Sequence, residues 1–113
     1  MRKGQVIEVD FEPQVGAEIM KKRPAVIISN TQLNNLLPVI TVVPLRGSLE
    51  LALDFMHIVN FDSKNGLTKD SFADVCQVKS IDKGRIKGVL GMLSKNDLAE
   101  IISSLDFVFH DAA

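Results

Sequence analysis

The sequence has few of the features that mark several large classes of protein. Among its 113 residues there is no Trp or Tyr, and Cys76 is the single cysteine. One cysteine cannot form an internal disulfide, which favours a reducing location. No apolar run approaches the roughly 20 residues that span a bilayer, and the N-terminus lacks the apolar core of a secretion signal. We therefore expect a cytoplasmic protein that does not associate with membranes.

An excess of one charge is also missing. The 13 Lys and Arg residues nearly balance the 14 Asp and Glu residues, giving a net charge of −1. This balance argues against a protein that coats nucleic acid by bulk charge, although a small basic site is compatible with it. With 46% hydrophobic and 24% charged residues the chain has the composition of a globular domain and not of a disordered one. Its length predicts one domain over residues 1–113.

Short β-branched and apolar runs predict a mostly β structure. The expected strands cover residues 5–11, 24–29, 39–43, 53–61, 71–81 and 86–92. The run 24–29 is apolar almost throughout, which is typical of a strand covered on both faces. Because proline cannot donate a ladder hydrogen bond, Pro24 is expected at the first position of its strand and Pro44 just beyond the end of the next.

The remaining segments predict loops and one long helix. Residues 14–22 are expected to form a loop, and residues 30–37 a turn that contains one helical turn. Ser94 is a good N-cap with Asp97 in the position of a capping-box acid, and apolar residues then recur with helical spacing to residue 109. Five to seven strands with one C-terminal helix indicate a small barrel or α+β domain. A nucleotide-binding α/β fold is disfavoured, since helices do not alternate with strands.

Most residues that could perform chemistry are scattered. His57, His110 and Cys76 have none of the paired spacings of metal ligands, so we expect no metal site. Glycine-rich phosphate loops are absent as well. Cys76 is expected to be a small core or barrel-wall residue of a strand in preference to a nucleophile. For His57 a structural place in a half-exposed strand is favoured over a role as general base.

One basic cluster is unusual. Lys21, Lys22 and Arg23 stand directly before the buried strand that Pro24 begins. Such a cluster can simply keep a sheet edge soluble, or Arg23 can present its planar donors to a phosphate. Arg46 ends the next strand, so the two arginines would converge if these strands are neighbours. The basic stretch over residues 79–87 is by itself more typical of a solvated turn.

At these residues the sequence resembles the MazF/PemK (Kid) toxins of bacterial toxin–antitoxin pairs. The resemblance rests on five segments in order, which together extend over almost the whole chain. They are the opening strand and D-x-x-P turn (4–13), the loop and Arg-Pro strand (16–18 and 23–30), the Val-Val-Pro-Leu strand (42–45), the segments 66–71 and 77–83, and the Gly-Met-Leu-Ser entry to the last helix (91–94).

The resemblance implies a fold, an activity and partners. The expected fold is a mainly β, SH3-like barrel with a C-terminal helix, assembled as a homodimer. The expected activity is sequence-selective, metal-independent and cofactor-independent cleavage of single-stranded RNA, inhibited by the C-terminal segment of an antitoxin.

The resemblance also assigns roles to individual residues. It implies Arg23, Glu18 and Arg46 as catalytic residues, with Glu18 a candidate base or loop organiser. The implied RNA-binding residues are Lys21, Lys22, Ser48, Gln77 and Lys79.

The chain departs from the family pattern at several of these positions. Arg46 stands where the family usually has Thr or Ser, and Ser48 is an alternative source of that hydroxyl. Cys76 replaces an acid of many relatives, and Asp74 stands where some relatives carry a catalytic arginine. A second hypothesis is therefore a non-catalytic toxin of the same fold that binds a protein, as the gyrase-targeting CcdB toxins do. A third, an SH3-like peptide-binding module, is disfavoured because Tyr and Trp are missing from the chain.

Overall fold

A computed structural model describes residues 1–11 and 22–111 of the protein. Seven strands and two α-helices make up this part of the chain, joined in three places by short 3₁₀ turns. The strands are β1 (Gln5–Asp10), β2 (Lys22–Ile27), β3 (Val39–Arg46), β4 (Ile58–Val59), β5 (Ser71–Ala73), β6 (Lys79–Asp82) and β7 (Ile86–Met92). The helices are α1 (Thr31–Leu36) and α2 (Lys95–Phe109), and the 3₁₀ turns are η1 (Leu49–Leu51), η2 (Val75–Gln77) and η3 (Lys83–Arg85). The predicted mainly β fold with a C-terminal helix is confirmed.

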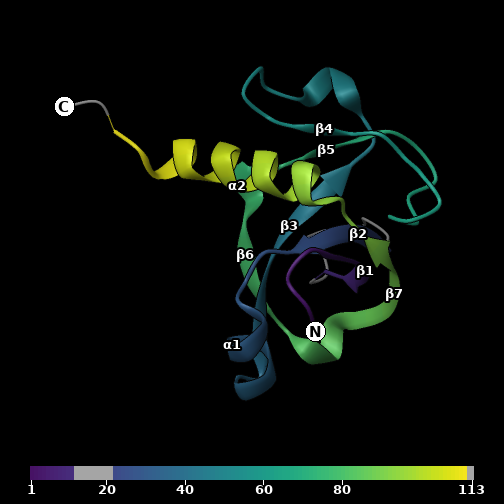
Figure 1. Ribbon diagram of the computed structural model, residues 1–113, viewed down its shortest axis with the longest axis vertical. Helices are drawn as coiled ribbons and strands as arrows, with labels where there is room; N and C mark the ends of the chain where they lie inside the picture. The colour runs from purple at the N-terminus through teal and green to yellow at the C-terminus, as the bar shows by residue number, and fades with distance from the viewer. Residues whose placement is uncertain (12–21, 112–113) are drawn as a thin grey trace, which may run out of the picture.

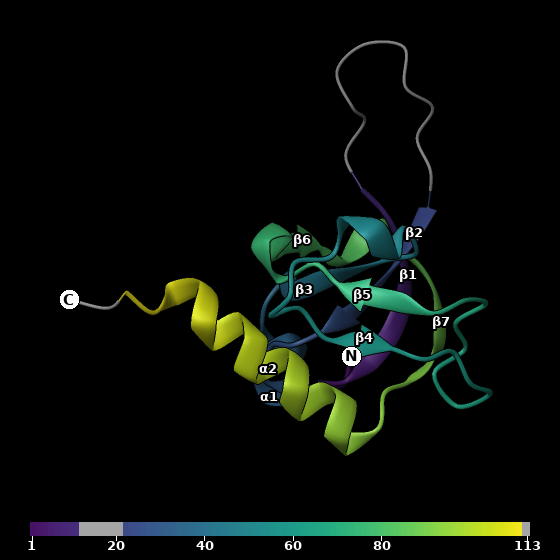
Figure 2. The same cartoon turned by 90° about the horizontal axis from the view of Figure 1, so that it is seen from above.

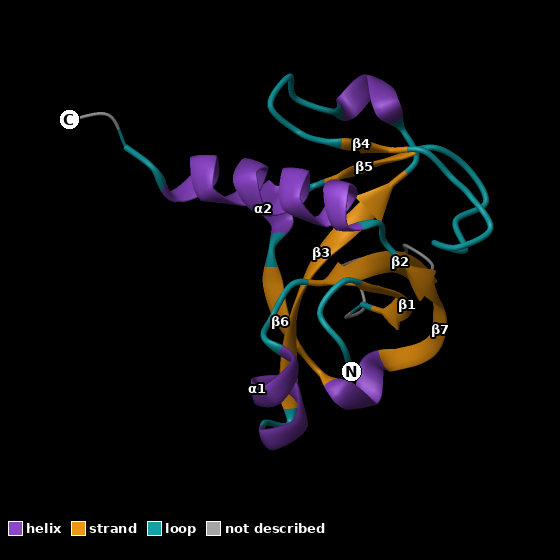
Figure 3. Ribbon diagram, in the orientation of Figure 1, coloured by secondary structure: helices purple, strands orange, loops and turns teal. Residues whose placement is uncertain are grey.

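The strands form one curled antiparallel sheet in the order β4-β5-β3-β2-β1-β7 (Figure 1, Figure 3). β6 pairs with the first half of β3 and β5 with its second half. Along this edge, β3 therefore changes its pairing partner part-way through the strand. The expectation that the two arginine-bearing strands are neighbours is correct, because β2 pairs with β3 from Ala25 opposite Pro44 to Ile27 opposite Val42.

The sheet buries apolar side chains on both of its faces. On the inner face of the curl a cluster from β1, β2, β3 and β6 is fully enclosed: Ile7, Val9, Ala25, Ile27, Ile40, Val42 and Ile81. On the other face a larger cluster lies between the sheet and α2, with Phe72 of β5 and Ile101 of α2 among its most deeply buried members. Ala25, Val26 and Ile27 are completely buried, which confirms the prediction of a strand covered on both faces.

Both prolines lie inside strands, so their expected places at strand ends are wrong. Pro24 is the third residue of β2, one residue ahead of the first residue paired with β3. Pro44 lies inside β3, between the stretch that pairs with β6 up to Val42 and the stretch that pairs with β5 from Leu45. Its missing N–H falls at this change of partner, while its carbonyl still accepts a hydrogen bond from the backbone N–H of Asp74 at 2.9 Å.

The expected long strand over residues 71–81 is in fact two strands. The 3₁₀ turn η2 interrupts it, with the Gln77 N–H donating to the Asp74 carbonyl and the Val78 N–H to the Val75 carbonyl. Cys76 lies on this turn and is exposed, so its predicted place in the core or barrel wall is also wrong. The strand predicted over 53–61 is limited to the two residues of β4.

Helix α2 begins where the sequence predicts. The hydroxyl of Ser94 accepts a hydrogen bond from the Asp97 backbone N–H at 3.0 Å, and the carboxylate of Asp97 lies 2.7 Å from Nε2 of His57. The helix runs along the side of the molecule that carries β4 and β5 (Figure 2), where the Ser104 hydroxyl donates to the Phe55 carbonyl at 2.9 Å. His57 is half-buried as expected but immediately precedes β4, so its predicted place within a strand is wrong. Within the described residues no helix is long and apolar enough to cross a membrane.

Candidate functional site

The candidate site lies where four strands extend beyond the inner cluster of the sheet. Side chains two residues apart share a face of a strand, and Val9, Ala25, Val42 and Ile81 all point into that cluster. On each of these strands the next position on the same face, two residues away, lies beyond the cluster. These positions are Phe11, Arg23, Pro44 and Lys79, and Arg46 lies two residues beyond Pro44. Because side chains alternate along a strand, these residues lie on the same face as the buried cluster but at the open end of the sheet.

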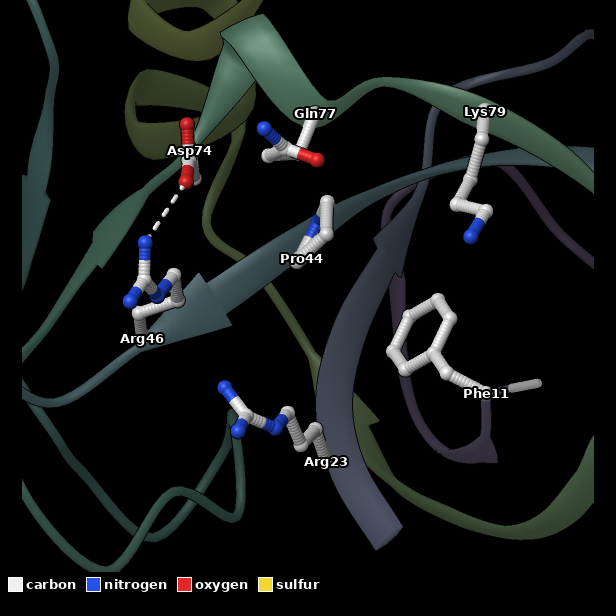
Figure 4. Close-up of a pocket in the computed structure, with 7 residues that line it drawn as sticks. All are labelled: Phe11, Arg23, Pro44, Arg46, Asp74, Gln77 and Lys79. Carbon is white, nitrogen blue, oxygen red and sulfur yellow. Dashed lines mark hydrogen bonds and ion pairs between the residues drawn. The ribbon is translucent and has the colours of Figure 1, made fainter. Parts of the chain in front are cut away.

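These residues help to line an open cavity of about 260 Å³. Its lining consists of Phe11, Arg23, Pro44, Arg46, Asp74, Gln77 and Lys79 (Figure 4). In Figure 4, Arg23 and Arg46 extend from neighbouring strands towards the same space, with Gln77 and Lys79 above them from the β6 side. The lining carries three cationic side chains and one carboxylate, so the cavity is suited to an anion.

Arg46 is the most firmly held of the three cations. Its Nη1 donates to Oδ2 of Asp74 at 3.0 Å, and its guanidinium carbon lies 5.6 Å from the centre of the Phe72 ring. The Asp74 side chain is only 7% exposed, against 33% for that of Arg46. The buried carboxylate and the buried ring therefore fix the guanidinium while part of it stays open to the cavity.

Arg23 has a different setting. It is exposed on β2 opposite Val9, and no carboxylate of residues 1–11 or 22–111 forms an ion pair with it. Its donors are accordingly available to an anionic ligand. At the far side of the cavity the ammonium of Lys79 lies 5.2 Å from the centre of the Phe11 ring, which places a cation and an aromatic face together.

The sequence-predicted site residues divide into three groups. Arg23, Arg46, Gln77 and Lys79 come together in the cavity, while Lys22 and Ser48 line a hollow that adjoins it. Glu18 and Lys21 lie outside the described residues, as does nearly all of the loop expected over 14–22. Among the described residues no three His, Cys, Asp or Glu side chains group as metal ligands.

Sequence reasoning did not assign three lining residues to the site, namely Phe11, Asp74 and Pro44, the last of which was expected only to stop its strand. Phe11 was expected only as the last residue of the strand over 5–11, and its position two residues after Val9 places it at the end of the core. Asp74 was noted only as a departure from the family pattern. The sequence separation of 28 residues between Asp74 and Arg46 gives no signal that they form a pair.

A family model of the PemK-like, MazF-like toxins of type II toxin–antitoxin systems matches residues 2–109. The chain belongs to this toxin family. Among curated relatives of the toxin are endoribonuclease MazF of Staphylococcus saprophyticus, 34% identical over 94% of this chain and 88% of that one, and endoribonuclease MazF9 of Mycobacterium tuberculosis, 32% identical over 93% and 92%.

Solved structures agree with this toxin fold. The crystal structure of MazF from Deinococcus radiodurans matches with a TM-score of 0.78 at 19% identity, covering 96% of this chain and 94% of that one. A mycobacterial endoribonuclease solved in complex with its cognate antitoxin matches with a TM-score of 0.72 at 18% identity, covering 95% and 92%. The expected MazF-like barrel fold is thereby confirmed.

Proposed function

We propose that this toxin is a sequence-selective endoribonuclease that cleaves single-stranded RNA, including mRNA, at the cavity of Arg23 and Arg46. The observation that carries the proposal is the convergence of these two guanidinium groups from neighbouring strands. Curated relatives more than 30% identical to the toxin are named endoribonucleases, which supports the same activity here.

The reaction follows from the chemistry of RNA. The 2′-hydroxyl attacks the adjacent phosphorus and loses its proton to a base, while the bond to the 5′-oxygen breaks and that oxygen takes up a proton. The products are a 2′,3′-cyclic phosphate and a free 5′-hydroxyl. Because the nucleophile is part of the substrate, the reaction needs neither a metal ion nor a cofactor to generate it.

The two arginines have complementary roles in this reaction. Negative charge builds on the phosphorane oxygens, and preorganised donors aimed at such charge lower the barrier most. Arg46, held by Asp74, supplies the fixed donor in place of the family's usual hydroxyl. Arg23, which has no carboxylate partner among the described residues, supplies the second donor. Glu18 is our candidate for the base or the loop organiser, and Ser48 the alternative hydroxyl.

The remaining contacts position the RNA. Phosphate binding is assigned to Lys21, Lys22 and Lys79, and base-edge contact to Gln77. Phe11 adds an aromatic face at the cavity, of the kind on which unpaired bases stack.

We further propose the assembly and regulation of the toxin. Residues 1–113 act as one toxin domain that forms a homodimer in the cytoplasm, and the C-terminal segment of a cognate antitoxin inhibits it. The antitoxin complex of a structural neighbour supports this assignment.

The test is cleavage of a long RNA of mixed sequence in EDTA, with mapped product ends. Wild type is expected to cut at a recurring short motif and leave 5′-hydroxyl ends. Arg23→Ala should lower the rate about 100- to 1,000-fold, the usual effect of losing one transition-state donor. Arg2→Ala removes an exposed arginine that does not line the cavity and should leave the rate unchanged. If folded wild type free of antitoxin leaves RNA intact, the toxin acts instead by binding a protein partner.

A further inference from the structure

A second hollow of about 460 Å³ adjoins the candidate site. The two share Arg23 and Arg46, which form the boundary between them. The walls of the second hollow come from the start of β2, from the end of β3 with the two residues after it, and from the segment that leads into β5. Its lining consists of Lys22, Arg23, Pro24, Leu45, Arg46, Gly47, Ser48, Leu67, Thr68, Lys69 and Ser71.

The charge of this hollow has one sign. Lys22, Arg23, Arg46 and Lys69 are all cationic, and no acid is among the lining residues that the structure describes. The acid next to Lys69 in sequence, Asp70, accepts a hydrogen bond from the Phe61 backbone N–H at 3.0 Å. Arg46 is already paired with Asp74, but no acid of the lining balances the other three cations, so a ligand of negative charge would relieve their mutual repulsion.

Lys69 has a defined position in the hollow. Its side chain crosses directly over Gly47, so that a Cβ built on Gly47 would lie no more than 2.9 Å from the Cδ, Cε and Nζ atoms of Lys69. A hydrogen bond from the Ser71 hydroxyl to the Lys69 carbonyl, 3.1 Å long, fixes the backbone from which this side chain extends. The absence of a side chain at position 47 thus provides the space through which Lys69 reaches the arginine pair.

We propose that the second hollow is a phosphate subsite for the RNA strand bound at the first, with Lys69 as its principal cation. The inference rests on the proposed function and adds a second site of contact to it. A nucleic-acid strand carries a phosphate at every nucleotide, so a strand whose scissile phosphate lies between Arg23 and Arg46 places a neighbouring phosphate beside them. The hydroxyls of Ser48 and Thr68 supply further donors to that phosphate.

The subsite gives a role to two residues that the proposed reaction does not use. Thr68 and Lys69 do not line the cavity in which the reaction is proposed, and they lie together with Lys22 in the second hollow. As phosphate contacts they fix the register of the strand without reading its sequence, because every nucleotide presents the same group. Lys69 is therefore a binding residue, and its loss should weaken RNA affinity in a way that depends on salt.

The experiment measures binding of a mixed-sequence, 2′-O-methylated RNA, which lacks the attacking hydroxyl and so stays intact. Titrations at several salt concentrations give the slope of log K against log salt, to which each phosphate contact on a single strand contributes about 0.7. Lys69→Gln is expected to weaken binding about tenfold and to reduce the slope by about 0.7.

Two further variants separate position from charge. Gly47→Ala keeps every charge but moves Lys69 aside, since the nearest atoms to the new methyl group belong to this flexible side chain. It should therefore reduce both the affinity and the slope as Lys69→Gln does. Lys64→Gln removes the same charge from an exposed lysine of the same loop that lines neither hollow, and should change neither quantity.

The possible outcomes distinguish the subsite from the ribonuclease activity. If wild type cleaves RNA but Lys69→Gln and Lys64→Gln give the same slope as wild type, the subsite is refuted and the activity stands. If wild type does not cleave RNA yet binds it with a Lys69-dependent slope, the subsite stands and the proposed activity fails. Failure of wild type both to bind this RNA and to cleave unmodified RNA would overturn both.

Discussion

The ion pair between Arg46 and Asp74 should make the two residues unequal in their effect on stability. Their side chains differ in exposure, at 33% for Arg46 and 7% for Asp74. Arg46→Ala would leave a nearly buried carboxylate without its cation, whereas Asp74→Ala would leave a guanidinium that water can already reach. An unpaired buried charge costs far more than an unpaired charge that can be hydrated.

The magnitudes follow from that difference. Breaking a fully buried pair costs about 3–5 kcal/mol and an exposed pair is worth at most about 1 kcal/mol. We expect Arg46→Ala to lower the free energy of unfolding by about 2–3 kcal/mol and Asp74→Ala by about 1 kcal/mol. The double variant removes both charges and should cost about 1 kcal/mol less than the sum of the single effects.

Urea unfolding of the four proteins measures these values, at one protein concentration because self-association would contribute to the apparent stability. Thermal unfolding gives an independent check, with a shift of about 4 °C for each kcal/mol in a chain of this size. Equal losses from the two single variants would contradict the reasoning, as would a double variant that loses their full sum. Either result would mean that Asp74 does not hold Arg46 in solution.

Two other predictions concern local conformation. Gly66 has a φ of +71° and a Cβ there would meet the backbone of Leu90, whereas the Cβ of Gly88 would meet nothing within 4 Å. Gly66→Ala should therefore lower the free energy of unfolding by about 2–4 kcal/mol, whereas Gly88→Ala should change it by no more than about 0.5 kcal/mol. Equal effects of the two substitutions in urea unfolding would refute this prediction. Ser94→Ala removes the N-cap hydroxyl of α2 and should cost about 1 kcal/mol, or about 4 °C in a thermal melt. Ser103→Ala, at an exposed position of the same helix, is the control. If Ser94→Ala and this control had the same melting temperature, the capping role of Ser94 would be contradicted.

Elements with a strong local signal are found where the sequence places them. The buried β2 follows from a continuous apolar run, and the start of α2 follows from Ser94 and the helical spacing after it. In each case the determining interactions lie within a few residues of one another.

The errors have a common physical origin in strand pairing. Pro44 was expected to end a strand, but the change of partner from β6 to β5 removes the need for its N–H. The long strand over residues 71–81 is broken at η2 for the same reason, since β5 and β6 pair with different halves of β3. Residues that pair lie tens of positions apart in the sequence, so no short window of sequence shows which strands will pair.

The candidate site shows the same division. The sequence alone determined that one arginine lies at the start of a buried strand and a second at the end of the next, and the family resemblance gave them a role. Only the tertiary structure decided that Asp74 holds Arg46, that Phe11 and Lys79 complete the cavity, and that Lys69 crosses Gly47 to a second hollow. Local patterning fixes which side of a strand a residue occupies, whereas the curl of the sheet decides which distant side chains then meet.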